Sequence, residues 1–449
     1  MTRRVSRNVL WNVSGTLASI GVGLAAMPLL LHSMGAARLG VFTLAIGLIG
    51  FSGLFDFGLG RALTQGVASA LGQGRTRTAV AALVWHVLKY LALFGAFWGL
   101  ALWLGAPFMV QHAFSLKGDL AAETVFGLRA MALSLPFTLM ATGTMGALEG
   151  LQCFREVSTR RAALSILQFG LPTVTALINP NVGWVIAAMA LSRVLGLIVW
   201  RRLLNQVLPR NKGHVIETGD LRQLLRFGGW LSISNLIGPL MVSADRFYLA
   251  TIFPPAFVAY YTVPNDALTR ASGLPNTAIS AVFPALAEAR GDAVRTRQLL
   301  RKSARTLHAL MLPPVLFGVA FALPILENWL GVDFAEHAEK VFQILLIGAY
   351  FNSCAFLPFA FLQSNGRSDL TAIIHLIELP VFAILLYLAT HRYGIDGAAL
   401  AWVIRMALDT ILLYIAAAVL DARQRNLLMK TMAITMSLGF LIAASIYAR

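Results

Sequence analysis

The sequence predicts an all-α polytopic membrane protein, with two six-helix lobes around a central cationic cavity and one extra, weaker helix at the C-terminus. Three observations lead to this fold class. The 449 residues are 58% hydrophobic and only 12% charged, whereas a soluble domain is about 25% charged. Apolar runs of about 20 residues, long enough for a helix to cross a bilayer, recur from end to end. Lys and Arg gather in alternate loops, as they do on the cytoplasmic side of membrane proteins.

Twelve apolar runs and a weaker thirteenth are predicted to be membrane spans with short loops between them. They lack the alternating pattern of barrel strands. The first lies where a signal peptide would lie, but its apolar stretch is too long for one, so we predict an uncleaved span. The predicted spans are residues 9–32, 39–61, 79–104, 122–148, 159–179, 183–204, 228–252, 256–286, 306–330, 338–363, 370–391, 396–420 and 431–448.

The basic residues of the loops orient these spans. With the N-terminus in the cytoplasm, the cytoplasmic segments hold 25 Lys and Arg and the outside segments hold 5. This bias predicts a cytoplasmic N-terminus. It also accounts for the net charge of +16 without a nucleic-acid partner. The basic loop 287–305 fits an amphipathic helix that lies on the lipids of the inner leaflet.

An internal repeat divides the chain into two halves. Three landmarks recur at an offset of 219 residues, and they are Trp11 with Trp230, Thr43 with Thr262, and Gly72 with Gly291. Because each half holds an even number of spans, both halves begin on the same side, which predicts a pseudo-two-fold axis along the membrane normal. The predicted organisation is an N-terminal lobe, a basic cytoplasmic linker, a C-terminal lobe and a tail, at residues 1–204, 205–227, 228–420 and 421–449.

Charged side chains fall inside the predicted spans, where each costs about 3 kcal/mol unless it meets a partner or water. Residues four apart share a helix face, so Asp266 lies beside Arg270. For the same reason Arg405 and Asp409 are predicted to form a structural ion pair. The charges are the cations Lys89, Arg129, Arg193, Arg246, Arg270 and Arg405, and the acids Asp56, Asp245, Asp266, Glu378 and Asp409.

The remaining charges need partners from elsewhere. Asp245 and Arg246 are neighbours that point about 100° apart on a helix, so they do not neutralise each other, although Arg246 is close enough to the outer boundary to reach the headgroups. Lys89, Arg129 and Arg193 have no acid at helical spacing on their own spans. A wet cavity lined by such cations would attract phosphate or carboxylate. Pairing with Asp56 or Glu378 across helices is the alternative.

No catalytic or metal-binding motif accompanies these charges in the sequence. There is no GxxxxGK[ST] phosphate loop, so we do not expect ATP hydrolysis. The eight His show no metal-ligand spacing. No predicted outside loop is long enough to carry the Arg or His of a membrane glycan polymerase. We therefore expect a protein that is not an enzyme and that has no metal or organic cofactor.

The clearest resemblance to a known family lies in residues 244–292, ADRFYLATIFPPAFVAYYTVPNDALTRASGLPNTAISAVFPALAEARGD. This run resembles the seventh and eighth helices of the Wzx-type polysaccharide flippases, which belong to the multidrug/oligosaccharidyl-lipid/polysaccharide exporter superfamily. Four further segments resemble the same family, so the resemblance covers nearly the whole chain. They are LGVFTLA, FDFGLGRALTQ, NGRSDLTAIIHLIELP and YGIDGAALAWVIRMALDTILL.

The resemblance implies alternating access to the cavity and an undecaprenyl-pyrophosphate-linked oligosaccharide as the substrate. This lipid would be flipped from the inner to the outer leaflet of the bacterial cytoplasmic membrane, for O-antigen or exopolysaccharide synthesis, with a polymerase and glycosyltransferases as partners. The candidates to bind pyrophosphate or acidic sugars are Lys89, Arg129, Arg193, Arg246 and Arg270. The candidates to couple transport to H⁺ or Na⁺ are Asp56, Asp245, Asp266 and Glu378.

Two other functions within the superfamily are alternatives. One is a multidrug or toxin ion antiporter, which would favour acids in its cavity because its drugs are cationic. Here six cations and five acids lie within the spans. The other is a lipid II flippase, which would be expected to have fourteen helices. Both comparisons favour the polysaccharide flippase.

Overall fold

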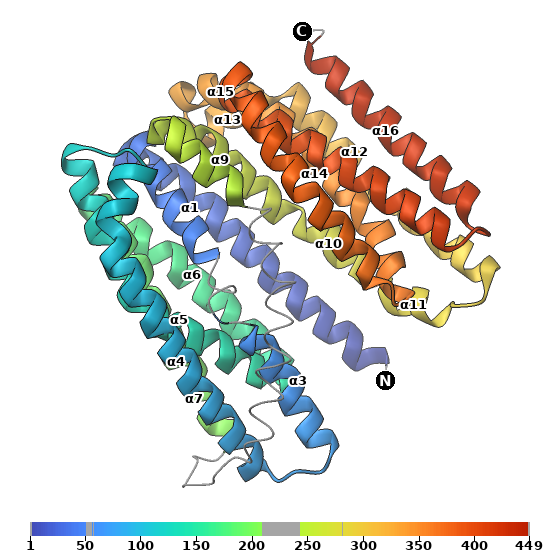
Figure 1. Ribbon diagram of the computed structural model, residues 1–449, viewed down its shortest axis with the longest axis horizontal. Coiled ribbons are helices and arrows are strands. Elements are labelled where there is room, and N and C mark those ends of the chain that lie inside the picture. Colours follow the sequence, from blue (N-terminus) through green and yellow to red (C-terminus); the bar gives the residue numbers. More distant parts are fainter. Residues whose placement is uncertain (1, 51–55, 57, 209–242, 281, 448–449) are drawn as a thin grey trace. The chain divides into compact units, whose positions relative to one another are not determined.

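The chain folds into long helices joined by short turns (Figure 1). The computed structural model describes residues 2–50, 56, 58–208, 243–280 and 282–447, and none of these residues belongs to a β-strand. The all-α prediction is therefore confirmed. Most of the predicted linker 205–227 and of the seventh span, 228–252, lies outside the described residues. The chain divides into two compact units, residues 1–259 (unit 1) and 260–449 (unit 2).

Unit 1 carries the first six predicted spans. A short helical segment at 243–252 also belongs to it. Within the unit, α5 packs against α3, α4 and α7, and α1 packs against α6. The helices are α1 (Thr2–Gly50), α3 (Leu59–Gly72), α4 (Arg77–Phe108), the short π-helix η1 (Met109–Ala113), α5 (Gly118–Gly150), α6 (Phe154–Ile178) and α7 (Val182–Val207).

Unit 2 is built around α14, which packs against α12, α13, α15 and α16. The eighth predicted span is divided into three helices, because Pro275 and Pro284 lie in the first turns of the second and third, where proline is tolerated. The helices that make up or enter this unit are α9 (Pro255–Ala271), α10 (Gly273–Ser280), α11 (Phe283–Glu288), α12 (Ala293–Ala320), α13 (Ala322–Leu330), α14 (Val332–Ser364), α15 (Ser368–Leu420) and α16 (Arg425–Tyr447).

Fewer membrane-spanning helices are counted than the sequence predicts. Eight helices of the described residues are long and apolar enough to cross a membrane, and α12 with α13, bent by 79°, would make a ninth. Two single helices each cover more than one predicted span: α15 contains two, and α1 contains the first and part of the second. Most of the seventh predicted span lies outside the described residues, and the eighth is divided into three helices. At the predicted thirteenth span the structure has α16, which begins at Arg425 rather than at 431.

Glycines make sharp turns between consecutive predicted spans. Gly35 in α1 has φ 77° and ψ 166°, and Gly394 in α15 has φ 62° and ψ −140°. Gly331, between α13 and α14, has φ 88° and ψ 163°. These backbone conformations are accessible to glycine and strained for residues with a Cβ. At Gly394 the chain turns so tightly that Gly397 packs against the backbone of Ala389, which brings the two halves of α15 face to face.

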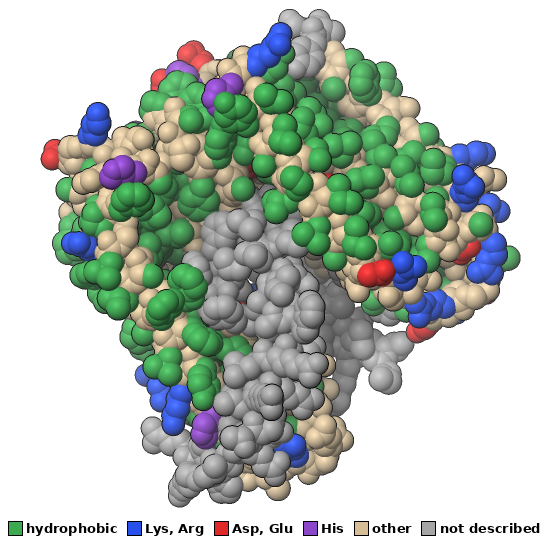
Figure 2. Space-filling model, viewed as in Figure 1, with side chains coloured by type: hydrophobic (Ala, Val, Ile, Leu, Met, Phe, Trp, Pro, Cys, Tyr) green, Lys and Arg blue, Asp and Glu red, His purple; other side chains and the backbone are tan. Residues whose placement is uncertain are grey.

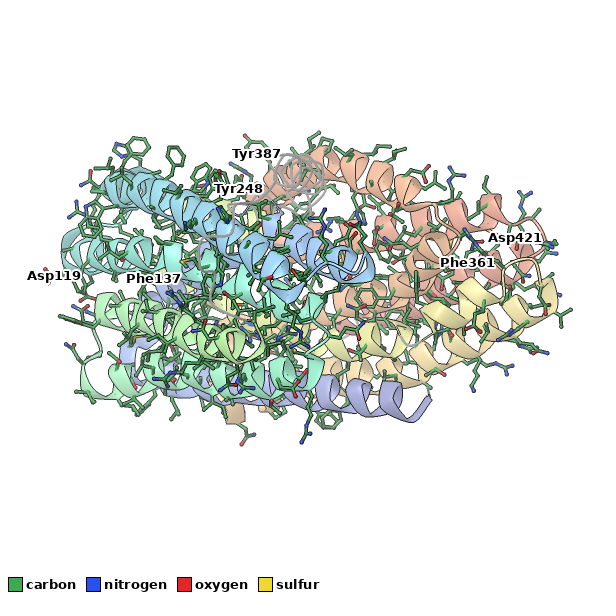
Figure 3. All side chains as sticks on the ribbon, turned by 90° about the horizontal axis from the view of Figure 1, so that it is seen from below. Asp119, Phe137, Tyr248, Phe361, Tyr387 and Asp421 are labelled. Carbon is green, nitrogen blue, oxygen red and sulfur yellow. The ribbon has the colours of Figure 1, made fainter. Side chains whose placement is uncertain are left out.

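Apolar side chains fill the interior of each unit and also cover much of its surface. In unit 1, Gly95 and Gly99 let α4 approach the backbone of α5 closely, as small residues do between membrane helices. In unit 2, Phe361 is buried in the core, whereas Tyr387 is exposed (Figure 3). Hydrophobic side chains predominate on the described surface seen in Figure 2, which is the surface expected of a protein in a bilayer.

An ion pair joins three helices of unit 1 at one end. Arg38 in α1 binds Glu123 in α5 through two hydrogen bonds, of 2.9 Å and 2.7 Å. The same carboxylate accepts a hydrogen bond of 3.1 Å from the backbone N–H of Val182, at the start of α7. A bidentate Arg–carboxylate pair requires a specific relative orientation of its two groups. Here the carboxylate must also lie within reach of a free N–H at a helix N-terminus. This pair therefore fixes the ends of α1, α5 and α7 relative to one another.

Replacing Gly394 by Ala tests whether the turn in α15 requires a positive φ. A Cβ at this position would meet nothing within 4 Å, so the cost is purely conformational, about 1–3 kcal/mol. The purified variant should therefore melt at a lower temperature in detergent. The control is Gly170→Ala, in the helical interior of α6 and also in open space, which should be neutral or slightly stabilising. Equal melting temperatures for the two variants would disprove the constraint.

Candidate functional site

Arg246 of unit 1 is buried against the backbone of α1. Its exposed fraction is 5%, and that of Asp245 is 0%. Its Nη1 donates a hydrogen bond of 3.4 Å to the carbonyl oxygen of Thr43. The side chain passes over Gly47, where a Cβ would lie 2.6 Å from the Cδ of Arg246. The structure thus places this guanidinium between helices of unit 1 rather than at an exposed end.

The carboxylate of Asp56 is also buried, with an exposed fraction of 4%. Its Oδ1 accepts a hydrogen bond of 2.8 Å from the N–H of Gly58, in the turn that leads into α3. A carboxylate at a helix N-terminus is stabilised by the free N–H groups and by the helix dipole. This contact gives Asp56 a structural role at the start of α3.

Arg193 lines a polar cavity between α5, α6 and α7. The cavity has a volume of about 280 Å³ and contains a second cation, Arg161. Arg161 is held by Glu149 at 2.8 Å, whereas the Nε of Arg193 is buried and has no hydrogen-bond partner among the described residues. Apolar side chains, among them Leu164 and Trp200, form part of the lining. Hydroxyl and amide groups also contribute, and they come from Thr138, Thr142, Ser165, Gln168 and Ser192. Such a cavity can bind a phosphate or carboxylate oxygen.

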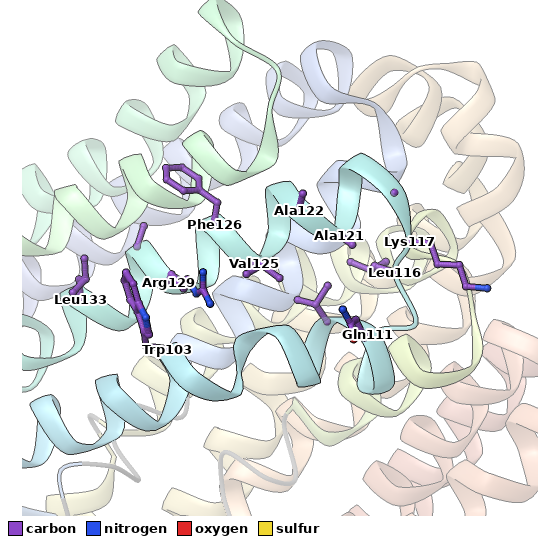
Figure 4. Close-up of a pocket in the computed structure, with 13 residues that line it drawn as sticks. Trp103, Gln111, Leu116, Lys117, Ala121, Ala122, Val125, Phe126, Arg129 and Leu133 are labelled. Carbon is purple, nitrogen blue, oxygen red and sulfur yellow. The ribbon is translucent and has the colours of Figure 1, made fainter.

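Arg129 and Lys89, the other two cations predicted to have no acid on their own spans, lie elsewhere in unit 1. Arg129 lines a larger cavity of about 920 Å³ between α4, η1 and α5, where its guanidinium lies 5.3 Å from the ring centre of Trp103 (Figure 4). Lys89 is exposed on α4. Arg129 and Arg193 therefore line two different cavities of unit 1. On α9, which enters unit 2, Asp266 and Arg270 are both partly buried.

Unit 2 contains a cluster of four ionisable side chains, here called the α15 cluster: His375, Glu378, Arg405 and Asp409. The first two lie before the turn at Gly394 and the other two lie after it. Arg405 Nε lies 3.9 Å from Glu378 Oε2, and His375 Nε2 lies 3.4 Å from Asp409 Oδ1. Arg405 and Asp409 thus both have partners across the hairpin. Their predicted pairing with each other stays a prediction.

The α15 cluster can hold a proton or a small cation. One ligand atom from each of His375, Glu378 and Asp409 lies within 4.8 Å of the others. Neither carboxylate oxygen of Glu378 has a hydrogen-bond partner among the described residues, which is costly for a group only 3% exposed. The nearby charge of Arg405 opposes a divalent metal ion. The donor set therefore suits H⁺ or a monovalent cation better.

His375 is not among the site residues predicted from the sequence, because none of the eight His has a second ligand at metal spacing. A local pattern existed, since His375 and Glu378 are three residues apart and share a helix face. Their meeting with Arg405 and Asp409 depends on the turn at Gly394, and the sequence does not give the register of that hairpin.

Comparisons with known proteins agree with the fold and show the family. A sequence model of the family described as "Polysaccharide biosynthesis protein" matches residues 5–290. The putative O-antigen transporter of Shigella flexneri is 28% identical over 409 residues, which are 91% of this chain and 96% of that protein.

Two solved structures share the fold at low sequence identity. The lipid II flippase MurJ, in an inward closed conformation, has a TM-score of 0.73 and 14% identity, with 97% of this chain and 93% of that one covered. A multidrug resistance MATE family transporter of the MOP superfamily, in an inward-facing conformation, has a TM-score of 0.71 and 15% identity, with 94% and 99% covered. The fold class is thus the one that both transporters share.

The contact between Arg246 and Gly47 can be tested with a double-mutant cycle. Gly47→Ala should destabilise the protein by about 1–3 kcal/mol, because the new methyl group displaces the Arg246 side chain. The same substitution should cost much less in an Arg246→Ala background, which gives a coupling of about 0.5–3 kcal/mol. Thermal unfolding of the purified variants measures both. Gly50→Ala, in open space on the same helix, is the control, and a coupling near zero would contradict the contact.

Proposed function

The chain belongs to the polysaccharide biosynthesis protein family, and we propose that it is a flippase for an undecaprenyl-pyrophosphate-linked oligosaccharide. The lipid would move from the inner to the outer leaflet of the bacterial cytoplasmic membrane for the synthesis of a cell-surface polysaccharide. The observation that carries the proposal is the family match over residues 5–290. The relative that is a putative O-antigen transporter, aligned over 91% of this chain, supports it.

The cavity at Arg193 supports an anionic substrate. A pyrophosphate group in a membrane needs cations and hydrogen-bond donors that replace its water. Arg193 offers a guanidinium whose Nε has no hydrogen-bond partner within the described part of the chain, and the side-chain amide of Gln168 lines the same cavity. The headgroup would enter such a polar site while the polyprenyl tail stays in lipid, and two lobes would give access to each side in turn. We also propose that the N-terminus is cytoplasmic. The partners in this proposal are a glycan polymerase and glycosyltransferases.

The two alternatives within the superfamily are each represented among the solved structures, by a multidrug transporter and by a lipid II flippase. At 15% and 14% identity, these likenesses concern the fold and do not choose between substrates. The relative of higher identity is a putative O-antigen transporter. That relative and the cationic cavity at Arg193 together favour the oligosaccharide.

For the energy source, we propose that H⁺ or Na⁺ binds at the α15 cluster. Buried charges such as those of the α15 cluster are stable only while their partners balance them, and an uncompensated one costs several kcal/mol. Binding a cation beside Glu378 and Asp409 would change the balance of charge against Arg405 and so would favour one arrangement of the hairpin over another. A conformational equilibrium biased in this way couples ion binding to access.

Arg193→Ala tests the substrate site. If Arg193 meets a phosphate oxygen, its loss should reduce polysaccharide export in cells about tenfold or more, because a charged hydrogen bond contributes about 1.5–3 kcal/mol. Arg193→Lys should retain part of the export, since it keeps the charge but not the planar guanidinium. Arg202→Ala is the matched control, because it removes an exposed Arg near the end of the same helix. Normal export by Arg193→Ala, at equal membrane abundance, would refute the site.

Glu378→Gln and Asp409→Asn test ion coupling in proteoliposomes. With an imposed H⁺ or Na⁺ gradient, the unmodified protein should respond to one of the two ions. Each variant should lose that response and keep slow movement of the lipid in the absence of a gradient. Glu336→Gln, an exposed acid on α14, serves as the control. If both variants respond to the gradient as the unmodified protein does, the α15 cluster is structural.

A further inference from the structure

The cavity between α4, η1 and α5 opens on a strongly apolar face of unit 1. Along α4, Leu93, Phe97, Leu100, Leu104 and Phe108 form a single exposed stripe, each with at least 60% of its surface exposed. On α5, Phe126 and Leu133 line the same cavity and are exposed. Exposed Leu and Phe at helical spacing on a membrane helix face the acyl chains of lipids.

The cavity itself is cationic. Its described lining contains Arg129 and Lys117 and no Asp or Glu. Two acids lie nearby on α5, Asp119 and Glu123. They line an adjoining cavity that shares Ala122 and Phe126 with this one, and Glu123 is engaged by Arg38. Figure 4 shows Arg129 extending from α5 toward α4, beside Trp103, with Gln111 and Lys117 nearer the turn between the helices.

The described residues leave hydrogen-bonding capacity of the Arg129 guanidinium unfilled. It lies over the ring of Trp103 at 5.3 Å, and its Nε is buried without a hydrogen-bond partner among the described residues. A guanidinium beside lipid chains is costly unless an anion or water reaches it. The cavity volume of about 920 Å³ leaves room for such a group. The lining extends from Lys117 at the turn to Leu133 within α5, and Arg129 lies one helical turn before Leu133.

We propose that this cavity binds an anionic phospholipid of the surrounding bilayer, with its phosphate at Arg129 and its acyl chains along the exposed stripes. The planar guanidinium of Arg129 can donate two hydrogen bonds to a phosphate diester. Trp103 and Leu133 line the same cavity beside Arg129 and would contact the chains. The lipid completes the packing between α4, η1 and α5, and the site is separate from the cavity at Arg193.

The full-length chain in phosphatidylcholine nanodiscs with increasing phosphatidylglycerol tests this site. The phosphatidylglycerol should carry a photoreactive group high on one acyl chain. Crosslinked peptides should come from residues 100–133, and the lipid should raise the thermal midpoint. The concentration for half effect should rise about tenfold or more in Arg129→Ala, because a charged hydrogen bond is lost. Ala121→Trp, which fills the cavity and keeps the charge, should remove the same crosslinks.

Controls separate this site from general charge effects. Arg392→Ala removes an exposed cation of unit 2 that stacks on Tyr393, and it should leave the lipid dependence unchanged. Inorganic phosphate alone should not raise the thermal midpoint. An equal effect of inorganic phosphate, or lipid dependence that survives in both Arg129→Ala and Ala121→Trp, would overturn the proposal. Should Arg129→Ala fail to fold, the crosslinks of Ala121→Trp decide the question.

Discussion

A charged side chain within apolar helices must meet a partner, a polar backbone group or water, and the structure of this protein depends on how that requirement is satisfied. Arg246 meets the carbonyl oxygen of Thr43 across a helix interface of unit 1. Arg405 and Asp409 meet Glu378 and His375 across a hairpin in unit 2. Each contact fixes two segments against each other, so the charges that seemed costly in the sequence also specify the packing.

The same requirement separates structural charges from candidate binding groups. Both carboxylate oxygens of Glu123 accept hydrogen bonds, from Arg38 and from the N–H of Val182. Its role is to fix the ends of three helices relative to one another. Arg193 and Arg129 lie in cavities with a buried Nε that no described residue satisfies. A cation with unmet hydrogen bonds beside open space binds an external anion more readily than one already neutralised. Anion binding in unit 1 is the function that this difference supports.

The sequence predicted the helical class and most span positions, because about 20 consecutive apolar side chains match the thickness of a bilayer. A segment in lipid must also satisfy its backbone hydrogen bonds internally, which a helix does. It could not predict that α15 continues to Leu420 with only Gly394 between its halves. Contacts such as His375 with Asp409 depend on that turn and on the register of the hairpin. Local spacing favoured Arg405 with Asp409, because residues three or four apart are the only neighbours that a single helix reveals.

We propose that the chain moves a lipid whose headgroup is anionic and carries sugars. The most direct measurement is flipping by the purified protein in proteoliposomes, with a fluorescent polyprenyl-pyrophosphate oligosaccharide compared with a neutral glycolipid that carries the same sugars. We expect the protein to accelerate transbilayer movement of the pyrophosphate lipid well above that of the neutral one. Equal rates for both lipids, or no acceleration over protein-free vesicles, would contradict it.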